Sequence, residues 1–457
     1  MRIDAPLFRE LGERFEHAVL VFLDAEGYPT SVATDYRVDA DRGVVVLARP
    51  AAHTIPPAGG EVNVIFSHVH PLPEMGYDER RYVQLWGRIE ERGDALELTP
   101  HRAHSWDEQK IPFFEYSEQT VPQARQYMAE LSRRQGRTVR PRLSFGWLAL
   151  RTTRAPFLTA TIVPVLLGIA VAALGGTWSI LRAVLTVIAA SFVHLALNVT
   201  NDVFDTLSGA DAANTTPTQF SGGSRVAHYG LVSVRGLAVL ATALYAAGIG
   251  IGLYLAAITD FWPLFWLGAA GVAISIVYTA PPFRLVHRGV GEIAVGLGFG
   301  PIMVLGAYFV QAGRYSWEAG YVSIPVAIFI ALVLYVNEIP DRKGDAAAGK
   351  RTLPVRWSKG AVIGGYVTAV TVAYAAIAAG AIVGIIPRPT ILALATIPLA
   401  AKVARGLAEH YEQPYALMPT MGTNIQLHAL SGLLLFLGYL AAVAADRLMD
   451  SVPIFLR

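Results

Sequence analysis

The chain has 457 residues, of which 53% are hydrophobic and only 16% are charged, and its formal net charge is +2. It contains no cysteine, which excludes disulfides, thiolate metal sites and a cysteine nucleophile. We expect no nucleic-acid partner for a chain of this composition.

Charge and hydropathy divide the chain into two unlike parts. Residues 1–143 are rich in charge and contain no apolar run long enough to cross a bilayer. The first residues carry scattered charges and lack the apolar core of a signal peptide. From Ser144 onward, apolar runs of about 20 residues follow one another, which is the length that a hydrocarbon core requires. We therefore predict a soluble domain at residues 1–143 and a membrane domain at residues 144–457.

The first part is predicted to be a small β-rich α+β domain. Apolar or alternating segments bounded by turn residues predict strands at residues 18–23, 30–36, 44–47, 62–67, 82–90 and 95–98, and amphipathic spacing predicts a helix at residues 118–134. The strand, D-A-E-G-Y-P turn and strand at residues 18–36 resemble the split-barrel flavin-binding domains related to pyridoxamine phosphate oxidase.

That resemblance implies an FMN site in the N-terminal domain. The alternative is a barrel without cofactor that serves dimerisation or regulation, and the absence of an evident phosphate-binding cluster in the sequence favours it. The histidines at positions 68, 70, 101 and 104 match no compact ligand spacing, so we interpret them as ordinary surface or turn residues.

The second part is predicted to be an all-α membrane domain with nine spans. They are expected at Pro156–Leu174, Trp178–Thr200, Leu231–Ile258, Pro263–Ala280, Gly291–Val310, Ala319–Val336, Gly360–Ile385, Thr390–Ala404 and Leu427–Ala445. Lysine and arginine gather in the loops on one side, which predicts that this side and the N-terminal domain are cytoplasmic in a multi-pass protein of the cell membrane.

Two acidic motifs close two of these apolar runs on the basic side. The first reads N-D-V-F-D at residues 201–205 and is followed by Asp211, and the second reads N-E-I-P-D at residues 337–341 and is followed by Asp345. On helices, each i,i+4 pair lies on one face, and two such faces would form an oxygen-rich cage suited to Mg²⁺ and a diphosphate. The alternative is solvated carboxylates at helix ends. Pro340 is expected to end or kink its helix.

Three basic loops are expected on the same membrane face as the acidic motifs. They read Q-F-S-G-G-S-R-V at residues 219–226, Y-T-A-P-P-F-R at residues 278–284 and A-G-K-R-T-L-P-V-R at residues 348–356. Their glycines free backbone N–H groups, and their cations suit phosphate oxygens. Arg151 and Arg154, ahead of the first span, could bind diphosphate, but we interpret them as topology anchors. The sequence thus predicts a site for a prenyl diphosphate whose tail enters the helix bundle.

These motifs and loops are similar to those of the UbiA superfamily of intramembrane aromatic prenyltransferases. The stretch at residues 348–356 is most similar to the 1,4-dihydroxy-2-naphthoate polyprenyltransferase branch. The resemblance implies a UbiA-like helix bundle and Mg²⁺-dependent transfer of a polyprenyl group from a polyprenyl diphosphate to an aromatic acceptor within the lipid bilayer.

The resemblance also implies roles for individual residues. It assigns Mg²⁺ binding to Asn201, Asp205, Asp341 and Asp345, support of that site to Asp202 and Asp211, and binding of the diphosphate to Arg225, Arg284, Lys350 and Arg351. Tyr278 is expected to stabilise the allylic cation through its ring, or else to be an interfacial aromatic residue.

Two other classes of function also agree with parts of this sequence. A member of the same superfamily with another acceptor would use homogentisate, 4-hydroxybenzoate, a tetrapyrrole or a glycerol phosphate. A membrane transporter would use carboxylates within its spans, but here the acids lie at span ends and not near the bilayer midplane.

Overall fold

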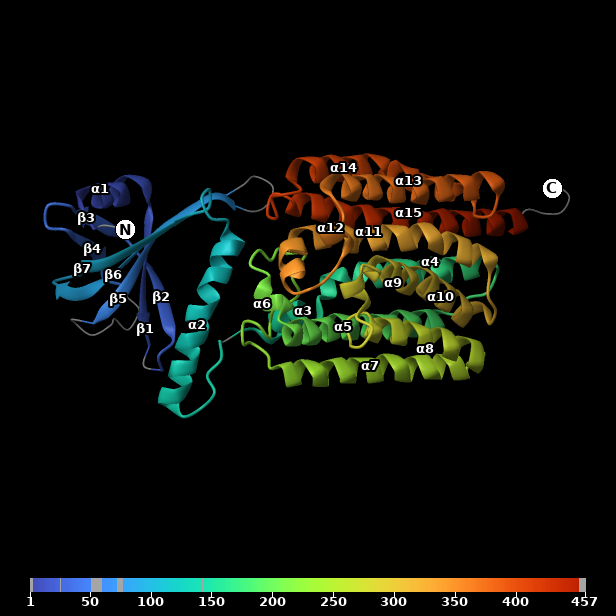
Figure 1. The fold of residues 1–457 in the computed structure, drawn as a ribbon, viewed down its shortest axis with the longest axis horizontal. Coiled ribbons are helices and arrows are strands. Elements are labelled where there is room, and N and C mark those ends of the chain that lie inside the picture. The colour runs from blue at the N-terminus through green and yellow to red at the C-terminus, as the bar shows by residue number, and fades with distance from the viewer. Residues whose placement is uncertain (1–2, 25, 51–59, 72–76, 142, 452–457) are drawn as a thin grey trace. The chain divides into compact units, whose positions relative to one another are not determined.

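The structure is a computed structural model that describes residues 3–24, 26–50, 60–71, 77–141 and 143–451 (Figure 1). The chain divides into two compact units, Met1–Val139 and Arg140–Arg457. The first consists of a sheet with two helices, and the second is helical.

The first unit is built on a fully antiparallel sheet. Its seven described strands lie in the order β2-β1-β5-β6-β7-β4-β3. They are β1 (His17–Leu23), β2 (Pro29–Thr34), β3 (Tyr36–Asp39), β4 (Val44–Ala48), β5 (Glu61–Pro71), β6 (Tyr77–Arg92) and β7 (Ala95–Asp107). The last three are longer than the sequence predicts, and β3 is a separate strand that it does not predict.

Alternating side chains explain the core of this unit. In β1, Ala18, Leu20 and Phe22 are buried while the residues between them are less so, as expected for a strand with one face on the core. Helix α1 (Ala5–Arg14) begins after Asp4, whose side chain accepts a hydrogen bond from the Leu7 backbone. The predicted helix at residues 118–134 is confirmed as α2 (Phe113–Gln135), and α1 was not predicted.

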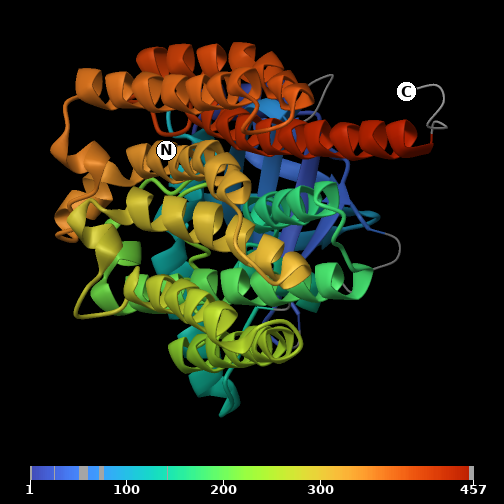
Figure 2. The ribbon, with the colours of Figure 1, turned by 90° about the vertical axis from the view of Figure 1, so that its right-hand side faces the viewer.

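The second unit is a bundle of long helices that run beside one another (Figures 1 and 2). Its α-helices are α3 (Phe145–Thr153), α4 (Thr159–Leu174), α5 (Ile180–Ser208), α6 (Ala210–Ala213), α7 (Val234–Ala257), α8 (Phe261–Val277), α9 (Gly291–Leu297), α10 (Met303–Ala312), α11 (Trp317–Ala347), α12 (Leu353–Arg356), α13 (Lys359–Val383), α14 (Ile397–His410) and α15 (Met418–Ser451). A π-helical turn at Gly298–Ile302 joins α9 to α10.

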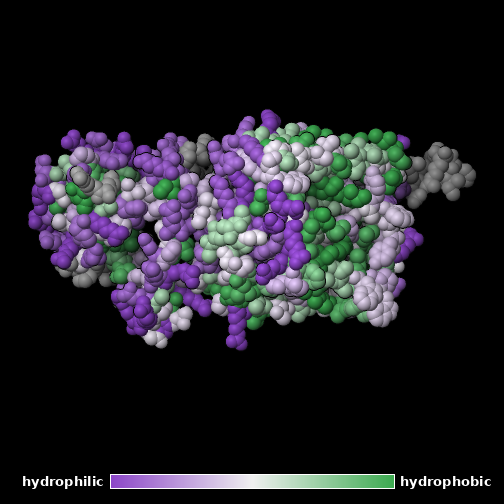
Figure 3. All heavy atoms as spheres, viewed as in Figure 1, coloured by the Kyte–Doolittle hydropathy of each residue, from purple (hydrophilic) through white to green (hydrophobic). Residues whose placement is uncertain are grey.

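Eight helices of the described chain are long and apolar enough to cross a membrane. The predicted count of nine is therefore approximate, because the fourth predicted span is α8, an apolar helix of 17 residues. At 1.5 Å per residue such a helix is slightly shorter than a hydrocarbon core of about 30 Å. Hydrophobic side chains cover much of the visible face of this unit (Figure 3). The chain is a multi-pass membrane protein with an N-terminal sheet domain.

Two helices carry the acidic motifs. The first motif lies in the last turns of α5, which packs against α4 and α7, and the second lies in α11, which packs against α9 and α13. Of the two expectations for Pro340, the one that it ends its helix is wrong, and the one that it kinks the helix stays a prediction. Helix α11 continues through Pro340 to Ala347, so Asp341 and Asp345 both lie on one helix, one turn apart. A proline removes one backbone donor, and the packing of the surrounding helices stabilises the rest of the helix.

Candidate active site

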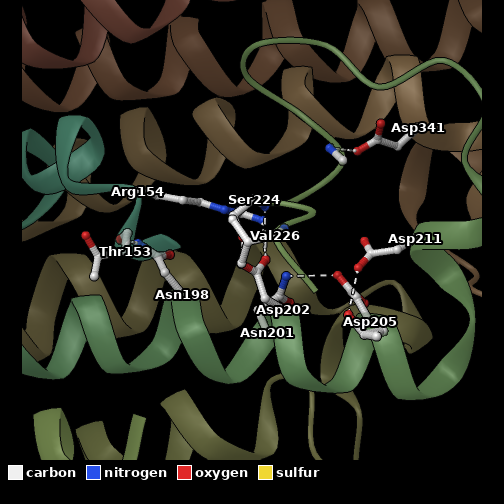
Figure 4. A network of polar contacts seen from close by, with 12 residues as sticks. Thr153, Arg154, Asn198, Asn201, Asp202, Asp205, Asp211, Ser224, Val226 and Asp341 are labelled. Atoms are coloured by element: carbon white, nitrogen blue, oxygen red, sulfur yellow. Dashed lines mark hydrogen bonds and ion pairs between the residues drawn. The ribbon is translucent and has the colours of Figure 1, made fainter. Parts of the chain in front are cut away.

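The first acidic motif forms a hydrogen-bonded group at the end of α5. The Asn201 side-chain amide donates to Asp205 Oδ2 at 2.9 Å, so this i,i+4 pair lies on one face as the spacing predicts (Figure 4). The helix ends at Gly209, which has a left-handed backbone, and α6 follows with Asp211. The Thr206 hydroxyl donates to Asp211 Oδ2 at 3.0 Å. Asp211 is therefore held beside the motif.

The loop after α6 connects the two motifs. The Asn214 side-chain amide donates to Asp341 Oδ1 at 2.8 Å, and the Gly222 backbone N–H donates to Asp341 Oδ2 at 2.8 Å. Two residues later, the Ser224 N–H donates to Asp202 Oδ1 at 3.1 Å, and the Ser224 hydroxyl also donates to Asp202. The N–H group of Gly222 thus binds a carboxylate of the second motif and not a phosphate oxygen, and the N–H group of Ser224 binds a carboxylate of the first motif.

Gly223 allows the close approach of this loop to α5. Its φ is +75°, and a Cβ atom there would lie 2.9 Å from Arg154 Nη2 and 3.0 Å from Asp202 Oδ1. Neither the backbone conformation nor the space admits another side chain without rearrangement. The glycines of this loop therefore serve the packing of the acidic site.

Lys350 closes the site from the loop after α11. Its Nζ lies 2.7 Å from Asp205 Oδ1 and 3.7 Å from Asp345 Oδ1. Burial alone would lower the pKa of Lys350. The carboxylates of Asp205 and Asp345 lie around its ammonium group and raise this pKa instead. Lys350 is therefore charged and bridges the two motifs.

The other cations differ in where they lie. Arg154, interpreted from sequence as a topology anchor, lies in the site, with Nη2 3.0 Å from Asp202 Oδ1 (Figure 4). Arg225 is buried, and its guanidinium lies 5.8 Å from the centre of the Tyr229 ring. Arg284 and Arg351 are exposed, and neither lines the cavity described next. Diphosphate binding by Arg225, Arg284 and Arg351 stays a prediction.

The motifs line a polar cavity of about 200 Å³ between α5 and α11. Its lining includes the carboxylic acids Asp205, Asp211, Glu338, Asp341 and Asp345 and the basic residues Arg154 and Lys350. Burial, followed by the charges of Asp205 and Asp202, raises the pKa of Asp211 to about 7. Acidic groups outnumber cations around this cavity, which makes it attractive to an additional positive charge.

A second, apolar cavity of about 570 Å³ adjoins the first. It is lined mainly by α5, α7, α8 and the segment from α9 to α10. Five residues line both cavities: His194, Leu197, Tyr278, Val295 and Phe299. Tyr278, at the end of α8, thus lies where the polar cavity meets the apolar one. A charged head group and an apolar tail on the same ligand would fit these two adjoining spaces.

The donor set fits a divalent cation in chemistry. Carboxylate and amide oxygens are the ligands that Mg²⁺ uses, and the four predicted ligands all line the polar cavity. Asp205 and Asp345, from facing helices, already share one cation, the Lys350 ammonium. In the part of the chain that the structure describes, no three His, Asp or Glu side chains are gathered closely enough to enclose a metal ion.

The sequence profile of the UbiA prenyltransferase family matches residues 161–427, more than half of the chain. The chain belongs to the UbiA prenyltransferase family. As a member of this family it is a prenyltransferase, so the prediction of that enzyme class is confirmed and the transporter alternative is wrong.

The alignments of this UbiA family member with several relatives cover most of the length of each relative. The 1,4-dihydroxy-2-naphthoate octaprenyltransferase of Bacillus subtilis is 26% identical over 68% of this chain and 98% of the relative. The 2-carboxy-1,4-naphthoquinone phytyltransferase of a Synechocystis species is 29% identical over 64% and 92%. The UbiA prenyltransferase domain-containing protein 1 of Dictyostelium discoideum is 30% identical over 52% and 72%.

Two contributors to the site receive too little weight from the sequence alone. For Arg154, which precedes the first span, a topology anchor is preferred to diphosphate binding, but at the end of α3 it contacts Asp202. The sequence indicates no role for Glu338 beyond its place in the second motif, but Glu338 lines the polar cavity. Its place in the motif beside Asn337 was the available indication, since a buried acid in a membrane helix is a functional candidate by default.

Proposed function

We propose that this UbiA family member transfers a polyprenyl group from a polyprenyl diphosphate to 1,4-dihydroxy-2-naphthoate, in a Mg²⁺-dependent reaction of menaquinone biosynthesis. The main support for the proposal is that an acidic cavity, which attracts cations, adjoins an apolar cavity at Tyr278. The diphosphate would occupy the polar cavity, and the prenyl chain would extend between α5, α7, α8 and α10.

The proposed metal ligands are Asn201 and Asp205 on α5 and Asp341 and Asp345 on α11. When bound, Mg²⁺ neutralises the diphosphate and favours loss of pyrophosphate. Lys350, now held by Asp205 and Asp345, is positioned to exchange these carboxylates for phosphate oxygens as metal and substrate enter. Asp202 keeps Arg154 and the glycine loop in place, and the predicted phosphate contacts of Arg225, Arg284 and Arg351 remain part of the proposal.

Tyr278 is the proposed neighbour of the reacting carbon. Its ring lines both cavities, so the allylic carbon of a prenyl diphosphate that spans them would pass it. The π face of a tyrosine attracts the positive charge that develops there when the bond to the diphosphate breaks. The ring carbon of the acceptor then forms a bond to that allylic carbon.

The acceptor is proposed from the relatives. Two of those compared act on naphthoate-derived acceptors by their names. Homogentisate, 4-hydroxybenzoate, a tetrapyrrole and a glycerol phosphate are the alternatives within the same chemistry. We further propose that the protein lies in the cell membrane with its basic loops and its N-terminal domain on the cytoplasmic side, in keeping with the lysine and arginine bias of the loops.

Two predictions stand for the N-terminal sheet domain: that it binds FMN, or that it is a barrel without cofactor. The sheet and α2 agree with the predicted α+β class, but no contact among the described residues bears on flavin. If purified protein shows no flavin absorbance after incubation with FMN, the prediction of FMN binding is wrong.

The test of the proposed function uses membranes from a host that lacks its own quinone prenyltransferase. Mg²⁺, a radiolabelled polyprenyl diphosphate and 1,4-dihydroxy-2-naphthoate are added to membranes with the expressed protein, and labelled lipids are separated. We expect a labelled demethylmenaquinone-like product that is absent without Mg²⁺. A product with another acceptor alone would change the acceptor, and no product with any aromatic acceptor would overturn the proposal.

A further inference from the structure

Two buried glutamates meet beside the proposed reaction site. Glu338 on α11 is 6% exposed and lines the polar cavity, and Glu292 in the first turn of α9 is 8% exposed. Both Glu338 oxygens and Glu292 Oε1 are buried, and none of these three atoms has an N–H or O–H partner among the described residues. The side chain within hydrogen-bonding reach of Glu338 is that of Glu292 itself.

Two carboxyl groups in contact require a proton between them. Ionised carboxylates only accept hydrogen bonds, and two negative charges at such a distance in a desolvated site repel strongly. A single shared proton makes one of them the donor and leaves one negative charge on the pair. Since Glu338 lines the cavity and Glu292 does not, the free acceptor lone pairs available to a ligand belong to Glu338.

The position of the pair suits the aromatic partner of the reaction. Tyr278, where the two cavities meet, lines the polar cavity together with Glu338, and a Cβ atom on Gly291, the residue before Glu292, would lie 3.5 Å from the Tyr278 ring. Lys350 Nζ lies 2.7 Å from Asp205 Oδ1 and 3.7 Å from Asp345 Oδ1, and the diphosphate is proposed to bind at these residues. Neither glutamate is among the ligands proposed for the metal ion or the diphosphate.

We propose that Glu338, hydrogen-bonded to Glu292, accepts the hydroxyl proton of the aromatic acceptor during prenyl transfer. The inference rests on the proposed function. As the bond between the allylic carbon and the diphosphate oxygen breaks, the ring carbon forms the new carbon–carbon bond and the adjacent hydroxyl becomes a carbonyl. Its proton passes to Glu338. When the carboxylate at the attacked carbon leaves as CO₂, the electron pair returns to the ring oxygen, which recovers the proton from Glu338.

Glu292 acts through Glu338 and is a positioning residue. It supplies the shared proton that keeps the pair singly charged and holds the Glu338 carboxylate toward the cavity. A general base positioned in this way contributes about 10²–10⁴-fold to a rate. We therefore expect Glu338→Gln to lower kcat at least about 100-fold, and Glu292→Gln to lower it roughly tenfold. The KM for the polyprenyl diphosphate and the Mg²⁺ requirement should not change.

The kinetic test includes a control on the same helix and a rescue. Glu318 lies in the first turn of α11 and lines neither cavity, so the Glu318→Gln variant should have the kcat of the parent protein. An acceptor analogue with a more acidic hydroxyl, already ionised at the working pH, needs no base. With it, the ratio of parent to Glu338→Gln kcat should approach one. Parent-like kcat in Glu338→Gln, or an undiminished deficit with the ionised analogue, would overturn the inference.

The shared proton is tested without any turnover. In infrared spectra, the difference between parent protein and the Glu292→Gln/Glu338→Gln double variant should contain the C=O stretch of one protonated carboxyl, which shifts in D₂O. Absence of that band would overturn the shared proton even if transfer proceeds. A parent protein that prenylates no aromatic acceptor would overturn the proposed function and the proton-transfer step together, whereas an active parent with an unaffected Glu338→Gln variant overturns this inference alone.

Discussion

Lys350 Nζ lies 2.7 Å from Asp205 Oδ1, so a cation from the loop after the second motif binds a carboxylate of the first. The two residues are 145 positions apart in the chain and both are largely buried. This contact couples the two halves of the acidic site and holds a positive charge where a cation-dependent substrate would bind.

Replacing Lys350 by glutamine should separate its two proposed tasks. The neutral amide cannot stabilise a leaving pyrophosphate, so we expect kcat with a polyprenyl diphosphate to fall about 100-fold. The same change frees Asp205 and Asp345 from their cation. Without substrate, Mg²⁺ raises the unfolding temperature when it binds, and we expect half of this rise at a lower Mg²⁺ concentration than in the parent protein. The matched control is Lys359→Gln, because Lys359 is exposed at the start of α13 and outside the cavity. Equal kinetics in the two variants would contradict the proposed role.

Asp341→Asn tests the metal site with little change in shape. The amide keeps one oxygen for Asn214 or Gly222 but removes the negative charge that Mg²⁺ requires. We expect activity to fall at least about 100-fold at ordinary Mg²⁺ concentrations, and to recover in part at high concentration. Product formation is measured across a Mg²⁺ titration after treatment of the membranes with a chelator. Asp260→Asn, ahead of α8 and away from the cavity, is the control, and an unchanged titration curve for Asp341→Asn would exclude this residue as a ligand.

Arg154 and Arg151 form a pair of neighbouring cations with different surroundings. Arg154 binds the buried Asp202, whereas the Arg151 guanidinium lies 5.8 Å from the centre of the Trp147 ring. Arg154→Gln leaves Asp202 without its cation, which should lower the free energy of unfolding by about 1–3 kcal/mol and reduce kcat/KM roughly tenfold. Arg151→Gln should change neither by much. Thermal unfolding and prenyl-transfer kinetics of both variants check the prediction. Equal decreases in stability and in kcat/KM for the two variants would contradict it and favour a role of Arg154 in membrane topology alone.

Gly252 and Gly250 on α7 provide a test of the prenyl channel. Gly252 lines the apolar cavity and Gly250 does not, and a Cβ atom at either position would meet nothing within 4 Å. Gly252→Leu should therefore fold normally while it shortens the cavity, so that kcat/KM falls for long prenyl diphosphates and persists for short ones. Gly250→Leu gains the same helix propensity, about 1 kcal/mol, without entering the cavity. A product distribution that stays the same in both variants would show that the chain does not follow this cavity.

Local sequence was sufficient to predict most of the elements and to name the candidate ligands. Apolar runs of span length predicted the long helices, because the hydrocarbon core demands such runs wherever they lie in the chain. The spacing of Asn201 from Asp205, and of Asp341 from Asp345, predicted side chains on one helical face, since the period of an α-helix is fixed. Alternation likewise predicted most strands of the N-terminal sheet.

Tertiary structure decided which charged groups meet. Sequence reasoning gave Arg284, Arg351 and Lys350 the same task, but only Lys350 lines the polar cavity, and Arg154 from the helix before the first span joins it. The direction of a long side chain depends on the loop that carries it and on packing between elements far apart in the chain. The contact between Glu292 and Glu338 has the same origin, because α9 and α11 are brought together only by the folding of the bundle. Sequence therefore determined the helices and their acidic faces, and the packing of those helices determined the chemistry between them.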